Sequence, residues 1–133
     1  MDDLLSNLDK EIVDRIHFTG FVDDDLLPYV YRNAQIFVFP SVYEGFGVPP
    51  IEAMSMGIPV ISSDAASLPE VLGDAAYYFK NRNLKDLKKQ IVAVMNLPKG
   101  QINLVKENGI IQASKYSWKN RSYKIEKAFI ERI

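Results

Sequence analysis

The strongest constraint on the fold of this chain is one string of nine residues, EGFGVPPIE, which runs from Glu44 to Glu52. The pattern of a buried strand precedes it at residues 35–39, and a helical pattern at residues 49–56 ends at Gly57. The two glycines let a backbone approach a ligand closely, and the Pro-Pro pair suits the first turn of a helix. A strand, a glycine loop and a helix N-terminus together present N–H groups and a positive dipole end to phosphate. The string therefore predicts a site for a phosphorylated ligand beside two carboxylates.

The rest of the chain alternates between strand and helix patterns. Strands are expected over residues 15–19, 35–39, 58–62 and 76–79. Helices are expected over residues 3–14, 23–31, 49–56, 70–72, 84–95, 99–115 and 118–131, the last with Ser117 as its N-cap. This alternation predicts an α/β fold, a partial Rossmann-like parallel sheet of about four strands with helices on both faces. Ligands of such sheets bind outside the carboxyl ends of the strands, where the loop carrying Glu44 is expected.

Length and composition place the chain in an ordinary class of globular protein. Its 133 residues predict a single domain, 1–133, and its start does not resemble a signal peptide. No apolar run approaches the length of a membrane span, so we expect a cytoplasmic protein. The chain contains no cysteine and one histidine, His17, which excludes thiolate and multi-histidine metal sites.

Charge is distributed unevenly along the chain. Residues 1–98 hold 14 acidic and 8 basic side chains, whereas residues 99–133 hold 8 basic and 3 acidic ones, interleaved with Trp118 and Phe129. One interpretation is a basic C-terminal helix that makes peripheral contact with an anionic membrane surface. The favoured interpretation packs the aromatic rings inward and leaves the lysines as a solvated face. We expect no nucleic-acid partner.

Five motifs carry a resemblance to a known family. In chain order they are Phe18-Thr19-Gly20, Phe39-Pro40-Ser41, the string from Glu44 to Glu52, Glu70-Val71 with Gly73-Asp74, and Tyr116-Ser117-Trp118. Together they resemble the C-terminal, donor-binding half of the retaining family-4 glycosyltransferases, which have the GT-B fold. The likeness runs from about Val13 to Phe129.

The resemblance implies roles for particular residues. It assigns the catalytic role to Glu44 and the binding of the donor to Gly45, Phe46, Gly47, Val48 and Glu52. Glu52 would accept hydrogen bonds from adjacent ribose hydroxyls, which suits a carboxylate. Glu44 would position the sugar and support an oxocarbenium-like transition state rather than attack the sugar. No metal or other cofactor is expected, and the Asp23-Asp24-Asp25 run is interpreted as the start of a helix.

The resemblance also implies parts that lie upstream in the family. An arginine and a lysine that face the donor diphosphate come from units before the Phe-Thr-Gly strand, and only 17 residues precede Phe18 here. We therefore expect a partial domain without the N-terminal acceptor domain, inactive by itself. The strands at residues 15–19 and 35–39 are expected to pair directly, or a homodimer is expected to cover their edges.

Three functional hypotheses follow. The first is the donor-binding domain of a retaining glycosyltransferase, which transfers sugar from a nucleotide-diphosphate sugar to a glycan or lipid-linked acceptor. Its pathway would be polysaccharide biosynthesis, such as that of O-antigen or capsule. The second is a non-catalytic nucleotide-sugar-binding or partner-docking module. The third, a GT-B sugar-nucleotide epimerase, is disfavoured because the string EGFG matches the transferase pattern more closely.

Overall fold

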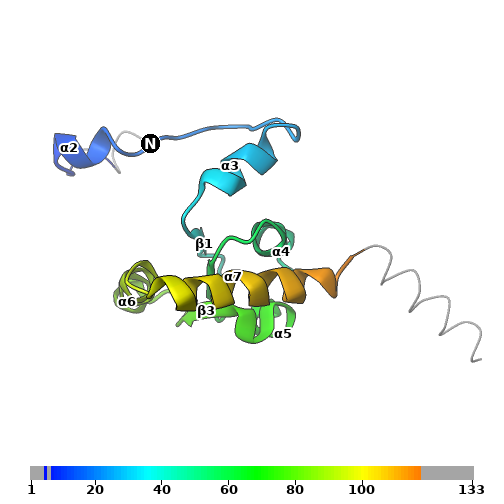
Figure 1. Ribbon diagram of the computed structural model, residues 1–133. Helices are drawn as coiled ribbons and strands as arrows, with labels where there is room; N and C mark the ends of the chain where they lie inside the picture. The colour runs from blue at the N-terminus through cyan, green and yellow to red at the C-terminus, as the bar shows by residue number, and fades with distance from the viewer. Residues whose placement is uncertain (1–4, 6, 118–133) are drawn as a thin grey trace, which may run out of the picture.

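A parallel sheet lies at the centre of the fold (Figure 1). The computed structural model describes residue 5 and residues 7–117. Within them the sheet has three strands, β1 (Phe37–Phe39), β2 (Val60–Ser63) and β3 (Ala76–Phe79), which are neighbours in this order. Both neighbouring pairs are parallel. The predicted α/β class with a parallel sheet is confirmed, and the described residues contain three strands rather than about four.

Six helices and one 3₁₀ turn accompany the strands in the described residues. They are α2 (Lys10–Val13), α3 (Leu27–Asn33), α4 (Val48–Ser55), α5 (Leu68–Leu72), η1 (Gly73–Ala75), α6 (Leu84–Met95) and α7 (Lys99–Ser114). The predictions for α4, α6 and α7 agree with these bounds to within one residue at either end. The helix expected over residues 118–131 lies outside the described residues. None of the described helices is both long and apolar enough to span a membrane.

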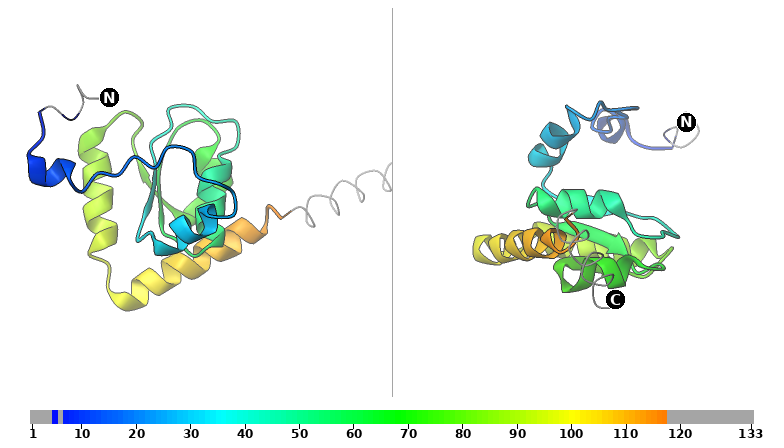
Figure 2. Two further views of the ribbon diagram at one scale, coloured as in Figure 1. Left: turned by 90° about the horizontal axis from the view of Figure 1, so that it is seen from above. Right: turned by 90° about the vertical axis from the view of Figure 1, so that its right-hand side faces the viewer.

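Helices cover both faces of the sheet, as predicted. Successive strand residues point to opposite faces, so Val60 packs in one cluster with Met54 of α4 and Ala113 of α7. Its neighbour Ile61 packs in a second cluster with Val94 of α6. Figure 2 shows how α7 starts beside the end of α6 and runs across to α4. The alternation in β2 therefore separates two cores, one on each face.

The strand expected over residues 15–19 does not form. These residues are exposed, with the Phe18 side chain 59% accessible. Figure 1 shows that the segment lies beyond α3, on the side away from the sheet. A strand is stabilised by hydrogen bonds to a neighbouring strand, and at that position none of the described strands is within reach. The direct pairing expected with residues 35–39 is therefore wrong. The expected homodimer stays a prediction.

Candidate functional site

The loop that carries Glu44 lies at the carboxyl ends of the strands, as the sequence predicts, and hydroxyl groups of neighbouring loops hold it there. The Ser63 hydroxyl, at the end of β2, donates to the main-chain carbonyl of Ser41, which follows β1. The Ser67 hydroxyl donates to the main-chain carbonyl of Glu44 at 2.8 Å. Because these bonds join the loop after β1 to the end of β2 and to the loop that follows it, the position of the Glu44 backbone is set by two separate parts of the chain.

The Glu44 carboxylate is half-buried and one of its oxygens is held by a neighbour. The Ser41 hydroxyl donates to Glu44 Oε1 at 3.0 Å and also lies 3.1 Å from the main-chain carbonyl of Tyr43. An ionised carboxylate has about four acceptor positions, so Glu44 can also accept a hydrogen bond from a ligand. The Ser41 hydroxyl thus stabilises the turn of the loop and orients the Glu44 carboxylate.

The two glycines of the loop have different roles in the fold. Gly47 is buried and has φ +83°, a conformation that favours glycine, and a Cβ there would lie 2.6 Å from Leu68 Cδ2. Gly45 is exposed, and a Cβ there would meet nothing within 4 Å. The fold therefore explains Gly47 without any ligand, whereas the described contacts leave the space beside Gly45 open.

The other residues of the string around Gly47 lie at the start of α4 or just before it. Phe46 packs edge-on against Tyr116, two residues after the end of α7, with ring centroids 5.2 Å apart. Val48 is the first residue of α4 and is exposed. Pro49 and Pro50 occupy the first turn and have no N–H, so the free donors at this helix end are fewer than usual.

Glu52 lies on α4 and meets α3 through a single described hydrogen bond. The Tyr31 hydroxyl donates to Glu52 Oε2 at 3.2 Å. Burial, and then the neighbouring Glu52 carboxylate, raise the pKa of Tyr31 to about 12, so this phenol stays protonated and donates. Among the described residues, Glu44 and Glu52 share no hydrogen-bonding partner: Glu44 lies among serines at the strand ends, and Glu52 lies against a tyrosine.

Two cavities adjoin Glu52. The first, about 330 Å³ in volume, lies between α3 and α4 and is lined by Asp24, Leu27, Pro28, Tyr31, Glu52, Ser55 and Met56. The second, about 350 Å³, lies between α4 and α7 and is mostly apolar, with Ile51, Ile110 and Tyr116 among its lining residues. A ligand in either cavity would meet the Glu52 carboxylate. Sequence patterns did not indicate the Tyr31 contact, because the two residues lie 21 positions apart and no local signal relates the predicted helix over residues 23–31 to Glu52.

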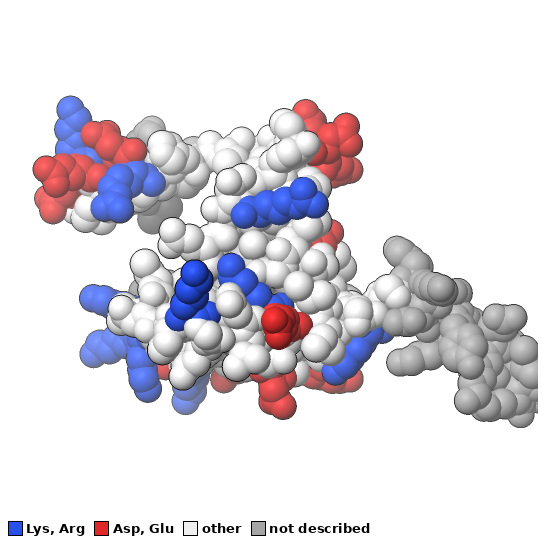
Figure 3. Space-filling view, in the orientation of Figure 1, with Lys and Arg blue, Asp and Glu red and all other residues white. Residues whose placement is uncertain are grey.

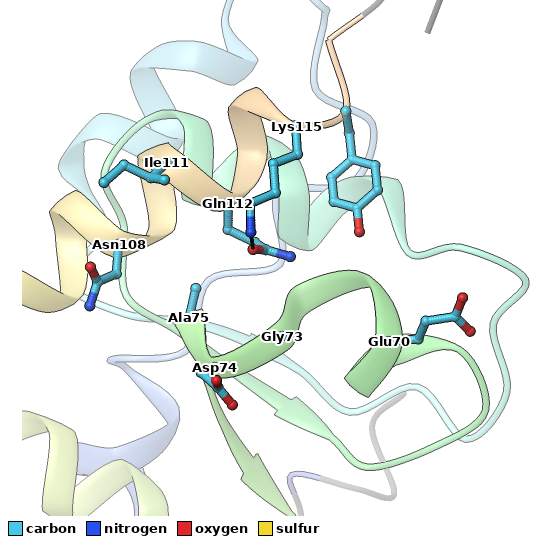
Figure 4. A pocket seen from close by; sticks show the side chains of 9 residues that line it. Glu70, Gly73, Asp74, Ala75, Asn108, Ile111, Gln112 and Lys115 are labelled. Carbon is cyan, nitrogen blue, oxygen red and sulfur yellow. Dashed lines mark hydrogen bonds between the residues drawn. The ribbon is translucent and has the colours of Figure 1, made fainter. Parts of the chain in front are cut away.

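A larger cavity, of about 580 Å³, lies between α5 and α7 (Figure 4). Gln112 donates to the main-chain carbonyl of Val71 at 2.7 Å and accepts from Lys115 Nζ at 2.7 Å. Glu70 and Asp74 also line this cavity. Because Gln112 is 9% exposed and its amide is bonded on both sides, its hydrogen bonds join α5 to α7.

Two groups of like charge stand out on the face of the molecule that Figure 3 shows. Figure 3 shows acidic groups gathered around the start of α3 and basic groups over α6. Three exposed acids, Asp23, Asp24 and Asp25, precede α3 in the chain, and the main-chain carbonyl of Asp23 accepts from the amides of Leu26 and Leu27. Among the residues that the structure describes, no three acidic or histidine side chains are arranged to hold a metal ion.

Comparisons with known proteins agree with this architecture. The family model for glycosyl transferases group 1 matches residues 4–115. The chain is 40% identical over 105 residues to O-antigen chain mannosyltransferase B of Escherichia coli, an alignment that covers 79% of this chain and 27% of the relative. It is 38% identical over 91 residues to O-antigen chain mannosyltransferase RfbU of Salmonella typhimurium, with coverages of 68% and 26%. The chain thus spans about a quarter of the length of these relatives.

Solved structures support the same assignment at the level of the fold. Sucrose-phosphate synthase from Thermosynechococcus elongatus superposes with a TM-score of 0.84, at 24% identity, over 98% of this chain and 33% of that one. The structural neighbours are GT-B glycosyltransferases, so the predicted fold is confirmed. Because the family model covers most of the residues, this chain belongs to the group 1 family of glycosyl transferases.

Proposed function

We propose that this chain is the donor-binding part of a glycosyltransferase that transfers mannose from a nucleotide-diphosphate mannose to a growing surface polysaccharide, with retention at the anomeric carbon. Membership of the family and the names of the two O-antigen mannosyltransferases support the class of reaction and the sugar. The observation that carries the proposal is the Glu44 loop, which lies at the carboxyl edge of the sheet with open space beside Gly45.

The arrangement suits a donor in a defined orientation. Glu52 would accept hydrogen bonds from the ribose, and Glu44 Oε2 would accept one from a sugar hydroxyl. The amides near Phe46 and the dipole of α4 would face the diphosphate. Since Pro49 and Pro50 provide no donors, further cationic side chains, such as the arginine and lysine that the family resemblance implies, are required to balance the diphosphate charge.

Catalysis in this proposal depends on positioning rather than on a protein nucleophile. With the diphosphate clamped and water excluded, the leaving phosphate would take the proton of the attacking hydroxyl on the same face of the sugar. Glu44 would stabilise the positive charge that develops on the sugar ring. No metal or other cofactor is required for these steps.

The test is a titration of the isotope-labelled chain with the guanosine, uridine and adenosine diphosphates and their mannose conjugates. Amide shifts of residues 44–53 are expected to move for one base, more strongly when mannose is attached. A variant that fills the open space, Gly45→Ala, is expected to weaken binding of the mannose conjugate about tenfold or more, because a methyl group would occupy the space of the sugar.

The matched control is Gly100→Ala, which also adds a methyl group where no atom lies within 4 Å, but on α7. It is expected to bind the donor like the wild type. If Gly45→Ala binds the conjugate as well as Gly100→Ala does, the sugar does not lie beside Gly45 and this part of the proposal is wrong. Binding without transfer to a polysaccharide acceptor, measured on the complete enzyme, would favour the non-catalytic module.

A further inference from the structure

We propose that Tyr31 is a positioning residue for Glu52: its hydroxyl holds one carboxylate oxygen and so fixes the orientation in which Glu52 meets the ribose of the donor. This inference rests on the proposed function, because it concerns the residue assigned to the ribose. The inference can be observed as a preference for ribonucleotides over 2′-deoxyribonucleotides. That preference would depend on the hydroxyl of a tyrosine on α3 that does not itself contact the ribose.

The ring of Tyr31 is held firmly enough for such a role. The side chain is 8% exposed and belongs to the apolar cluster that covers one face of the sheet. It packs against Phe37 of β1 with ring centroids 5.6 Å apart, and Phe37 in turn stacks on Phe39 at 6.1 Å. Because a strand of the sheet fixes the ring, the hydroxyl is directed at one place on α4.

Glu52 receives that hydroxyl without being closed off from solvent. The bond joins the Tyr31 hydroxyl to Oε2 at 3.2 Å, and an ionised carboxylate has about four acceptor positions, so Oε1 keeps its full capacity. Both side chains line the cavity of about 330 Å³ between α3 and α4. The terminal torsion of a glutamate has no sharp preference of its own, so an external donor is needed to select one orientation.

In the alternative, the hydrogen bond between Tyr31 and Glu52 only stabilises the packing of α3 on α4. Loss of such a bond would lower the free energy of unfolding but would weaken the binding of all nucleotides equally. Loss of a positioning bond would weaken the binding of ribonucleotides more than that of their 2′-deoxy analogues, because only ribonucleotides present the pair of hydroxyls that Glu52 is proposed to bind. The ratio of the two dissociation constants therefore separates the roles.

The experiment compares Tyr31→Phe with the wild-type chain. Phenylalanine keeps the ring and its packing on Phe37 and removes only the donor. Amide-shift titrations give the dissociation constants of a nucleoside diphosphate and its 2′-deoxy form, with the base chosen by the titration above. We expect Tyr31→Phe to reduce the preference for ribose about tenfold, the effect of losing one hydrogen bond to a charged group.

The matched control is Tyr78→Phe. The Tyr78 hydroxyl donates to the main-chain carbonyl of Gly73 at 2.7 Å, also in a partly buried site but away from Glu52. This variant is expected to keep the wild-type preference for ribose. A second comparison introduces Tyr31→Phe into Glu52→Gln, where it should change the ribose preference no further, since Tyr31 acts through the carboxylate.

The outcomes separate the inference from the proposed function. If the wild-type chain binds the nucleotide but shows no preference for ribose, Glu52 does not bind the ribose. The inference about Tyr31 is then wrong as well. If the wild type prefers ribose and Tyr31→Phe keeps that preference, the inference alone is overturned. Should Tyr31→Phe not fold, Phe37→Leu loosens the ring while keeping the hydroxyl, and an unchanged ribose preference in that variant would overturn the inference.

Discussion

Gly47 and Leu68 are in such close contact that a Cβ at Gly47 would lie 2.6 Å from Leu68 Cδ2. Gly47 is the residue before α4, and Leu68 is the first residue of α5 and fully buried. The start of α4 is therefore packed directly on another helix. This contact holds the end of the Glu44 loop in place by packing, before any ligand binds.

The first prediction concerns Gly47→Ala. The methyl group would clash with Leu68, and the residue would keep a positive φ that L side chains rarely adopt. Strain of about 1 kcal/mol and overpacking of about 1–3 kcal/mol together lower the free energy of unfolding. Urea denaturation followed by circular dichroism measures this. Gly45→Ala, two residues away and without a clash, should stay within about 0.5 kcal/mol of the wild type; equal losses in the two variants would refute the packing argument.

A second prediction concerns the hydroxyl of Ser67, which donates to the main-chain carbonyl of Glu44. Ser67→Ala should lower the free energy of unfolding by about 1 kcal/mol and speed amide hydrogen exchange in residues 44–47. Ser55→Ala is the control, because the Ser55 hydroxyl donates to the main-chain carbonyl of Glu52 within α4. Unchanged exchange in the Glu44 loop of Ser67→Ala would show that this bond does not hold the loop.

The third prediction is a dependence of stability on pH. Burial raises the pKa values of Tyr31 and Tyr78 from 10.0 to about 12, with smaller contributions from the charges of Glu52 and Asp74. The folded chain therefore keeps two protons that the unfolded chain releases between about pH 10 and 12. The free energy of unfolding should be constant with respect to these groups below about pH 10 and fall as the pH rises towards about 12.

The measurement is urea denaturation at a series of alkaline pH values, together with the ¹³C shifts of the two tyrosine rings. The double variant Tyr31→Phe, Tyr78→Phe should lose less stability between about pH 10 and 12 than the wild type, because it lacks both titrating groups. If the two proteins lose stability in parallel, the alkaline loss arises from other groups and the prediction is wrong.

A fourth prediction concerns Gln112, whose amide joins α7 to α5. Replacing it by alanine leaves the buried carbonyl of Val71 without its donor and opens a small cavity, so Gln112→Ala should lower the free energy of unfolding by about 2 kcal/mol or more. Asn108→Ala, an exposed position lining the same cavity, should stay within about 0.5 kcal/mol of the wild type. Similar thermal denaturation curves for these two variants would contradict this account.

Local signals in the sequence determined the order and the type of most elements. The strand at Ala76–Phe79 and the helix at Leu84–Met95 have the bounds that their residue patterns predict. Asn83 caps that helix through its side chain, which accepts from the amide of Asp86, so the helix start is specified within four residues. The string from Glu44 to Glu52 likewise indicated a loop and a helix start at the carboxyl edge of a sheet.

The segment at residues 15–19 shows where local patterns are insufficient. Its composition is typical of a strand, yet it is unpaired and exposed in the structure. A strand depends on hydrogen bonds to a neighbour, and whether that neighbour is within reach depends on the arrangement of the whole sheet.

The contacts of the two acids were decided only by the tertiary structure. Tyr31 and Glu52 lie 21 residues apart, and Ser67 and Glu44 lie 23 residues apart. The sequence by itself determined which carboxylates stand at the candidate site, because the residues of a loop and a helix start act over a few positions. Folding decided which hydroxyl groups hold them, because the distance between two side chains on different elements follows from how those elements pack and not from any spacing along the chain.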